Sequence, residues 1–262
     1  MRTIIYRLIS AVNNLAVNIM IKFFTASNKP LDLFRCILKN DYIAKHPKTI
    51  SVNDDSRGLP ERNNEFIGHA LDSGEECWLV FCHDDVIFLE DISVKIESLP
   101  KNKIYGLCGV KKINGVGEIV GRIMQPSKTE ENEFVTLGRE VDGHETVATF
   151  DSLCTIVHSS LFEYSCPLKY AHGLGDLRFD ENLMYHMHVE EFSINALENF
   201  DIKSAVVQID CLHLSWGSKN EYYYKAVEYV KNKHNLESFI CTCDKRALDN
   251  YEDDQGWKKC VI

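Results

Sequence analysis

The stretch WLVFCHDDVIFLED, residues 78–91, joins an apolar run to one histidine and two carboxylates. Residues 78–82 have the length and composition of a buried strand, and His83, Asp84 and Asp85 follow it directly. In open α/β sheets, ligands bind beyond the carboxyl ends of the strands. Carboxylate and imidazole groups at such a place can hold a divalent cation, which in turn binds phosphate oxygens. Asp84 and Asp85 also suit the N-cap of a following helix, so the segment alone leaves both interpretations open.

Two earlier strand-like segments also end in polar residues. The segment IMIKFFTAS, residues 19–27, is followed by Asn28, and the segment KTISV, residues 48–52, is followed by an Asx-rich turn. That turn consists of Asn53, Asp54 and Asp55. We expect all of these strand ends to converge on one crevice. No G-x-G-x-x-G motif and no Walker lysine are present, which excludes a dinucleotide Rossmann site and a P-loop.

The segments between these strands have helical patterns. Pro30 begins the first one, and Gly74 closes the second, which starts at Leu59. We expect the apolar residues of the first to lie on one helical stripe: Leu31, Leu33, Phe34, Ile37 and Leu38. The order strand, helix, strand, helix, strand predicts an α/β fold with a mostly parallel sheet flanked by helices.

A second acidic pair, Glu190 and Glu191, begins a predicted helix in the stretch YHMHVEEFSINALENF. One apolar stripe runs along it: Val189, Phe192, Ala196, Leu197 and Phe200. In the first helical turn, the helix dipole favours the ionised carboxylate that a general base requires. Acidic residues are also common there without a chemical role, so the spacing leaves both interpretations open.

Histidines lie close to these elements in the sequence. His213 follows the strand-like segment SAVVQIDC, and it suits either a metal ligand or a structural role. His186 and His188 flank the start of the predicted helix, where they suit contacts with a phosphate or an acceptor as well as exposed spacers. Asp180, in LRFDENL, is expected to order the loop ahead of that helix.

Composition narrows the classes of function. The 262 residues include 29 lysines and arginines against 39 aspartates and glutamates, which gives a formal charge of −10. A nucleic-acid-binding protein needs a basic face, so we expect no nucleic-acid partner. The ten cysteines are irregularly spaced, with one close pair at Cys241 and Cys243, so we expect reduced and mostly buried thiols.

Residues 1–18 pose a separate question. Apolar residues recur there at helical spacing, but polar residues interrupt any run long enough to span a membrane. No small-residue cleavage site is present, which argues against a signal peptide. An amphipathic helix packed on the domain and a membrane-surface anchor both fit the pattern. We therefore expect a cytoplasmic protein, with this helix as a candidate contact to the inner face of a membrane.

Several of these segments resemble those of family 2 glycosyltransferases. SVNDDSRG resembles that family's V-D-D-G-S strand end, with Asn53 and Asp54 on its two aspartates and Asp55 on its glycine. VFCHDDV resembles the aspartate-x-aspartate segment, and more closely the F-x-H-Q-D-V version of a bacterial subgroup. LPERNNEFIGHAL is similar to a helix of that subgroup, with Asn64 on its asparagine. Three further segments follow in the same order as in the family: VATFDSLCTIVHSSLFE, LRFDENLMYHMHVEEFSINAL and CLHLSWG. The resemblance therefore spans residues 19–217.

The resemblance implies a GT-A fold and the transfer of a sugar from a nucleotide-sugar donor to a hydroxyl of a glycan or glycolipid acceptor. It assigns a divalent metal, Mn²⁺ or Mg²⁺, to Asp85 and His213. It makes Glu191 the general base of an inverting transfer, with Glu190 in reserve. It implies donor contacts for the following residues: Asn28, Asn53, Asp54, Asp55, Asn64, His83, Asp84 and Asp151. The expected parts are an N-terminal helix (1–18), the GT-A domain (19–217), and a C-terminal helix and tail (218–262).

The sequence departs from the family pattern in ways that keep two other hypotheses open. His83 replaces the first aspartate of the aspartate-x-aspartate segment, and Asp55 replaces a glycine in the region that contacts uracil. One alternative is a metal-dependent phosphoester or pyrophosphate hydrolase, which would need two metals and more ligands. The other is a catalytically inactive module that binds nucleotide sugars on the same fold.

Overall fold

The structure is a computed structural model, and it describes most of the chain. The described residues are 19–52, 56–113, 116–131, 133–163, 175–217, 219–239, 241–242 and 257–259. The helix predicted over residues 1–18 lies outside them, and so do the predicted donor contacts Asn53, Asp54 and Asp55.

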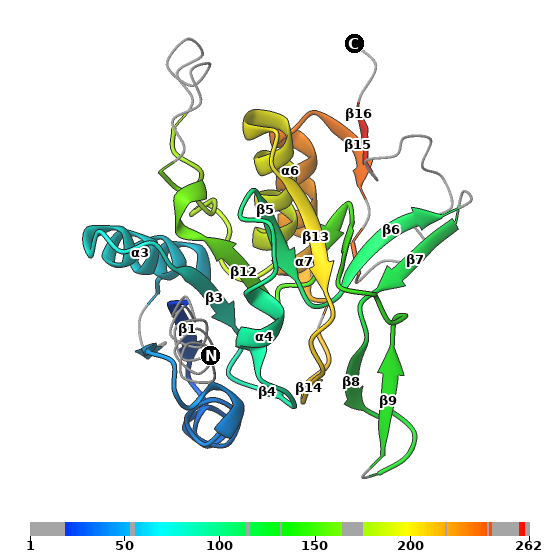
Figure 1. Ribbon diagram of the computed structural model, residues 1–262. Helices are drawn as coiled ribbons and strands as arrows, with labels where there is room; N and C mark the ends of the chain where they lie inside the picture. Colours follow the sequence, from blue (N-terminus) through cyan, green and yellow to red (C-terminus); the bar gives the residue numbers. More distant parts are fainter. Residues whose placement is uncertain are drawn as a thin grey trace, which may run out of the picture.

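A seven-stranded sheet forms the centre of the molecule (Figure 1). Its order is β10 (His144–Thr146), β13 (Lys203–Val207), β5 (Lys103–Gly106), β12 (Cys154–His158), β3 (Trp78–Cys82), β1 (Ile21–Ser27) and β2 (Lys48–Val52). Only β10 and β12 run antiparallel to their neighbours, so the other five strands share one direction. The predicted α/β class, a mixed and mostly parallel central sheet flanked by helices, is confirmed.

Alternate residues of the central strands pack into two cores, one on each face of the sheet. In β3, Trp78, Val80 and Cys82 face η1 (Leu33–Leu38) and α4 (Ile92–Ile96). Leu79 and Phe81 face α3 (Leu59–Asp72) and α6 (His188–Phe200) on the other side. Because both faces are covered by helices, β3 is apolar at every position.

Three smaller sheets complete the fold. The first pairs β4 (Val86–Phe88), β14 (Cys211–His213), β8 (Ile123–Pro126) and β9 (Phe134–Leu137). The second pairs β11 (Thr149–Phe150), β6 (Gly109–Ile113) and β7 (Val116–Val120), and the third pairs β15 (Leu236–Phe239) with β16 (Trp257–Lys259). The other helical elements are α2 (Pro30–Asp32), η2 (Asp41–Ile43), η3 (Ser159–Leu161) and α7 (Glu221–Lys233). None of the described helices is both long and apolar enough to cross a membrane.

The prediction that the apolar residues of the first helix form one stripe is wrong. Cys36 and Ile37 of η1 are buried, but Leu31, Phe34 and Leu38 are exposed. The reason is geometric: in a helix, residues 33 and 37 point away from residues 31, 34 and 38, and only one side can face the sheet. The segment is therefore apolar on both sides.

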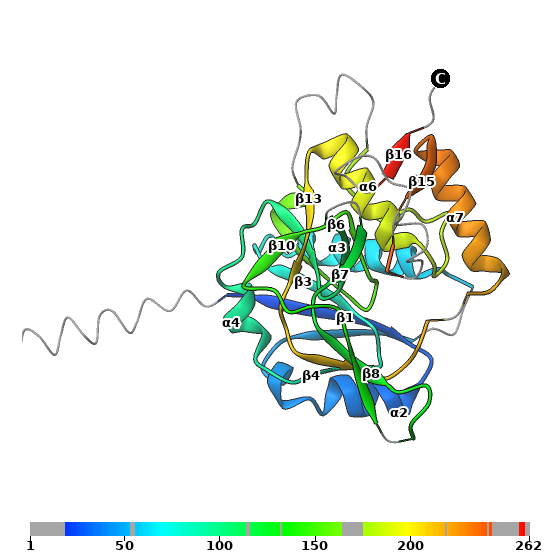
Figure 2. The same ribbon diagram turned by 90° about the vertical axis from the view of Figure 1, so that its right-hand side faces the viewer.

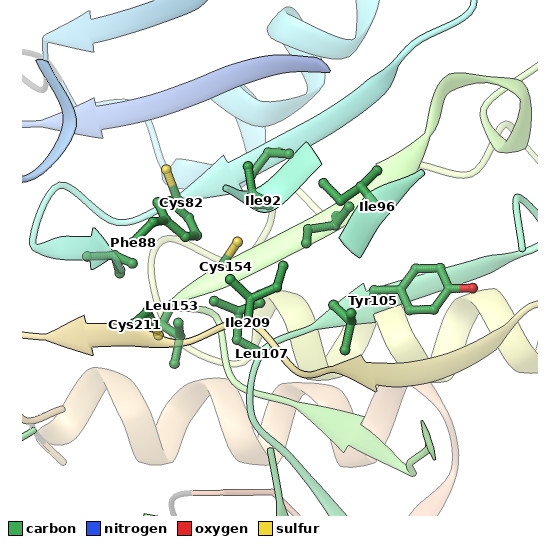
Figure 3. Packing of buried hydrophobic residues seen from close by; sticks show 14 of the residues in the cluster. Cys82, Phe88, Ile92, Ile96, Tyr105, Leu107, Leu153, Cys154, Ile209 and Cys211 are labelled. Atoms are coloured by element: carbon green, nitrogen blue, oxygen red, sulfur yellow. The ribbon is translucent and has the colours of Figure 1, made fainter. Parts of the chain in front are cut away.

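The core beneath the carboxyl end of β3 contains cysteines. Figure 3 shows Cys82, Cys154 and Cys211 among apolar side chains such as Phe88 and Leu153. Burial raises the pKa of Cys82 and Cys211 to about 12, so both are neutral thiols near pH 7. All seven cysteines within the described residues are buried, as the sequence predicts.

Candidate functional site

The predicted convergence of strand ends is seen at β1 and β3, which are parallel neighbours. Ser27, the last residue of β1, donates a 2.5 Å hydrogen bond from its Oγ to Oδ2 of Asp84. Asn28 follows as an exposed residue at the same edge of the sheet. Asp84 therefore ties the two strand ends together, and its interpretation as a helix cap does not hold, because β4 follows it.

A candidate metal centre lies one residue further along. His83, Asp85 and His213 each place one ligand atom within 4.8 Å of the others. Asp85 Oδ1 lies 3.5 Å from His213 Nε2 and 4.0 Å from His83 Nδ1. Pairing of β14 with β4 brings His213 to this position, with Leu214 N donating to the carbonyl of Asp85. The resemblance assigns the metal to Asp85 and His213 and the donor to His83. The structure adds His83 to the candidate ligands, which agrees with the strand-end pattern of one imidazole beside carboxylates.

The burial of this cluster fits a ligand set. Asp85 and His213 are both buried, and neither Asp85 Oδ1 nor His213 Nε2 has a hydrogen-bond partner within the described part of the chain. A contact of 3.5 Å is too long to satisfy either atom. Buried polar atoms without partners are costly, and a cation shared by the three side chains would satisfy them. The set of one carboxylate and two imidazoles suits a transition metal such as Mn²⁺ or Zn²⁺ better than Ca²⁺.

Burial and the neighbouring groups shift the pKa values of all three side chains of the cluster. Burial works against ionisation of Asp85, but His213, Ser215 and His83 outweigh it and hold the pKa of its carboxyl below the ordinary value. Burial likewise works against protonation of His213, but Asp85 outweighs it and raises the pKa of this imidazole. Burial and the nearby His213 lower the pKa of His83. The site is thus built around one ionised carboxylate.

Gln125 of β8 contacts the other nitrogen of His213. Its Nε2 lies 2.8 Å from His213 Nδ1, and its buried Oε1 has no partner among the described residues. Turning the amide about its last bond exchanges the two atoms, which differ little in size. In the turned orientation Oε1 would accept from Nδ1–H, and the lone pair of His213 Nε2 would face Asp85. The turn would give up the 3.5 Å contact of Gln125 Nε2 with the carbonyl oxygen of Ser215. Gln125 is therefore suited to select the metal-binding tautomer of His213.

A pocket opens beside His83, between β1, β3, α3 and the start of α6. Its polar lining consists of Asn63, His83, Ser152, Thr155 and His188. Asn63 is buried, and its Oδ1 has no hydrogen-bond partner within the described ranges. Asn64, the predicted donor contact, instead faces a loop: its side chain bonds the backbone N–H and carbonyl of Phe179. The pocket asparagine is therefore Asn63.

His188 is held in one tautomer. Its Nδ1 lies 2.9 Å from the carbonyl oxygen of Tyr185, so Nδ1 carries the proton and donates it. Burial lowers the pKa of this imidazole to about 4, which keeps it neutral near pH 7. Met187, just before it, has a left-handed backbone (φ 62°), a conformation that is unfavourable outside glycine and is often found at functional sites. His188 thus lines the pocket and offers a lone pair on Nε2.

The two glutamates of α6 lie in different surroundings. Glu191 is fully buried, and its Oε1 accepts from Lys233 Nζ at 2.6 Å and lies 3.1 Å from His234 Nε2. Lys233 also binds Asp180, which orders its loop by accepting from Asn182 N, as the sequence predicts. These contacts make Glu191 part of the junction between α6 and α7.

Glu190 is buried on a different side of α6. Burial, with a further contribution from Asp151, raises the pKa of its carboxyl to about 8. Asp151 accepts hydrogen bonds from Leu153 N and from Thr242, and its charge also acts on His83 and His213. The charge of Asp151 thus acts on Glu190 as well as on His83 and His213, whereas Glu191 is bound by Lys233 of α7. Which of the two acts as a base stays a prediction, and this placement favours Glu190.

Glu191→Gln is expected to affect stability more than catalysis. The amide removes the negative charge that Lys233 and His234 share, and hydrogen bonds to charged groups contribute about 1.5–3 kcal/mol. The free energy of unfolding, measured in urea, should fall by about 2 kcal/mol. Glu190→Gln is the matched control, because a glutamine resembles the protonated acid that burial already favours there. A stable Glu191→Gln variant without transfer activity would restore Glu191 as the base.

Solved structures resemble this chain only at low sequence identity. No protein-family model and no curated protein matches the chain. The structure of A197 from STIV matches at 12% identity and a TM-score of 0.42, over 76% of this chain and 87% of that one. HddC from Yersinia pseudotuberculosis matches at 14% identity and a TM-score of 0.31, over 86% and 84% of the two chains. The inositol-1-phosphate CTP transferase from T. maritima matches at 10% identity and a TM-score of 0.33, over 81% and 96%.

Proposed function

We propose that the protein is a metal-dependent glycosyltransferase, which moves a sugar from a nucleotide-sugar donor to a hydroxyl of a glycan or glycolipid acceptor. The observation that supports this most is the cluster of His83, Asp85 and His213 beside a pocket. Within it, the buried ligand atoms of Asp85 and His213 lack hydrogen-bond partners in the described structure. A divalent cation there, for which this mixed ligand set favours Mn²⁺, would offset the charge that develops on a leaving nucleoside diphosphate.

The pocket is suited to the sugar of the donor. The oxygen of Asn63 and Nε2 of His188 are both acceptors, and sugar hydroxyls are donors that can satisfy them. Phe24, Leu59 and Phe81 give the pocket an apolar wall, on which the C–H faces of a sugar ring can pack. The buried polar groups favour one orientation of the ring, because any other position of its hydroxyls would leave the oxygen of Asn63 without a hydrogen-bond partner.

Glu190 is proposed as the general base of an inverting transfer. Its carboxylate takes the proton from the acceptor hydroxyl as that oxygen bonds to the anomeric carbon and the bond to the diphosphate breaks. A pKa of about 8 makes the carboxylate a stronger base than an ordinary glutamate. The acid form that dominates at neutral pH must first lose its proton.

Incubation with a panel of nucleotide sugars, with and without Mn²⁺ and an acceptor, tests the proposal. Release of nucleoside diphosphate that requires both the metal and the acceptor supports glycosyl transfer. Release of phosphate from simple esters would instead indicate the hydrolase, and tight nucleotide binding without turnover would indicate the inactive module. Pyrophosphate formed from a nucleoside triphosphate and a sugar phosphate would show nucleotidyl transfer and overturn the proposal.

Gln125→Leu is expected to weaken Mn²⁺ binding by about 10- to 100-fold, which is typical when a metal-bound histidine loses its hydrogen-bond partner. Calorimetric titration of the donor-free protein with Mn²⁺ measures this loss. Gln125→Glu should retain the affinity, because its carboxylate also accepts from Nδ1–H of His213. Gln208, another buried glutamine, bonds Arg122 N and Val141 N instead, so Gln208→Leu should lower stability without changing metal affinity. Unchanged Mn²⁺ affinity in Gln125→Leu would contradict the positioning role.

A further inference from the structure

An apolar stripe is exposed on the outer side of α2 and η1. Leu31, Phe34 and Leu38 have exposed fractions of 70%, 49% and 48%, and Tyr42 of η2 continues the line at 46%. Their spacing of three and four residues places them on one side of the helical segment. The opposite side already packs into the core through Cys36 and Ile37. We call the stripe, together with the cations around it, the α2–η1 face.

The α2–η1 face is positively charged in an acidic protein. Lys29, Arg35 and Lys39 are exposed around the stripe, and the acidic residues of the segment are Asp32 and Asp41. Residues 29–42 contain three lysines and arginines against two aspartates, whereas the whole chain has a charge of −10. Lys39 Nζ lies 5.4 Å from the ring centroid of Phe34, so a cation and an apolar side chain share the same surface.

We propose that the α2–η1 face binds the surface of an anionic membrane. Apolar side chains flanked by lysine and arginine are the composition of helices that lie in the interface of a bilayer, where the cations meet lipid phosphates. A symmetric dimer through this face would bring two positive surfaces together, which disfavours a second copy as the partner. The proposal does not depend on the glycosyltransferase assignment.

The position of the face relates it to the candidate site. Figure 2 shows α2 on the side of the molecule opposite α6 and α7. The segment begins directly after Asn28, at the carboxyl end of β1, where the crevice lies. Binding through the α2–η1 face would thus bring the crevice edge close to the lipid headgroups, where an acceptor attached to a lipid would be accessible.

Vesicle sedimentation with the full chain tests this inference. The probes are phosphatidylcholine vesicles with and without phosphatidylglycerol. We expect the wild type to bind the anionic vesicles and to dissociate as salt is raised, because salt screens exposed charges. The triple variant Leu31→Ser, Phe34→Ser, Leu38→Ser should lose at least about tenfold in partitioning, given the apolar area that it no longer inserts. Arg35→Glu with Lys39→Glu should lose at least about tenfold on anionic vesicles alone.

Control variants distinguish binding through the α2–η1 face from nonspecific binding by other exposed apolar residues. Val94, Tyr222 and Tyr224 are exposed apolar residues on α4 and α7, so their triple replacement by serine should leave binding unchanged. Three results would overturn the inference. They are absence of wild-type binding to anionic vesicles, unchanged binding by the Leu31, Phe34, Leu38 variant, and a wild-type dimer that this variant converts to monomers. Unchanged binding would move the membrane contact to another segment, with residues 1–18 as the next to test.

Discussion

Asp85→Asn is expected to abolish Mn²⁺ binding, and with it metal-dependent binding of nucleoside diphosphates, in a chain that still folds. Asp85 is the only carboxylate of the cluster in the described structure, and its charge is what makes two imidazoles into a cation site. Asparagine keeps the size and one oxygen but loses that charge. Calorimetry should show at least about a 100-fold loss of Mn²⁺ affinity. This exceeds the loss of about 10- to 100-fold that is typical when a hydrogen-bond partner of a metal ligand is replaced. Added Mn²⁺ should no longer raise the melting temperature, since a ligand stabilises only a protein that binds it.

Asp84→Asn is the matched control for this variant. It makes the same chemical change at the adjacent residue, whose carboxylate accepts from Ser27 and lies outside the cluster. We expect Asp84→Asn to retain Mn²⁺ affinity in the absence of a donor. If Asp84→Asn loses the metal and Asp85→Asn keeps it, the ligand assignment is wrong and the glycosyltransferase proposal loses its main support.

Glu190→Gln is expected to retain donor binding and to lose about 10²- to 10⁴-fold in kcat, the usual contribution of a general base. Glutamine preserves the shape of the side chain but cannot accept the proton of the acceptor hydroxyl. In the wild type, kcat should rise with pH up to about 8, because the carboxylate is the active form and burial raises its pKa to about 8. A loss below about tenfold in Glu190→Gln, together with a larger one in Glu191→Gln, would assign the base to Glu191.

Stability provides a second test of Glu190 that does not involve turnover. Below its ordinary pKa of 4.5, the carboxyl is protonated in both the folded and the unfolded chain, so folding carries no ionisation cost. Between pH 4.5 and about 8, the unfolded chain releases the proton while the folded chain keeps it. This difference lowers the wild type's stability as pH rises. The free energy of unfolding of the wild type should therefore fall relative to that of Glu190→Gln over this interval. If the two free energies change in parallel with pH, the pKa of Glu190 is not raised.

The sheet could be predicted because its strands are marked locally. Apolar runs such as residues 21–27 and 78–82 end in polar residues, and helical patterns between them require parallel crossovers. Asp85 could also be singled out because it lies just after a strand, and His213 because the resemblance places a histidine there; the structure makes it the last residue of β14. Their proximity could not be derived from spacing, because it depends on the pairing of β14 with β4, which lie far apart in the sequence.

Side-chain direction was the harder part of the prediction. Adjacent residues on a helix differ by about 100° in direction, so a pattern that locates Asn63 and Asn64, or Glu190 and Glu191, does not decide which of each pair faces the site. In α3 the structure turns Asn63 toward the pocket and Asn64 toward Phe179. The exposed side of residues 31–38 was missed for the same reason, because apolar residues occupy both sides of that segment.

The candidate metal centre joins two sheets that the chain completes at different times. His83 and Asp85 follow β3 of the central sheet, whereas His213 belongs to β14 of the β4–β14–β8–β9 sheet and comes nearly half of the chain later. A chain emerging from the ribosome therefore carries two of the three ligands long before the third, and it cannot close the site until both sheets have paired. Metal affinity would then report on completed assembly, since the energy of binding a preformed site adds only to the fully folded state. Pulse labelling of a refolding chain should accordingly show cation uptake as the last event, after the central sheet is protected from exchange.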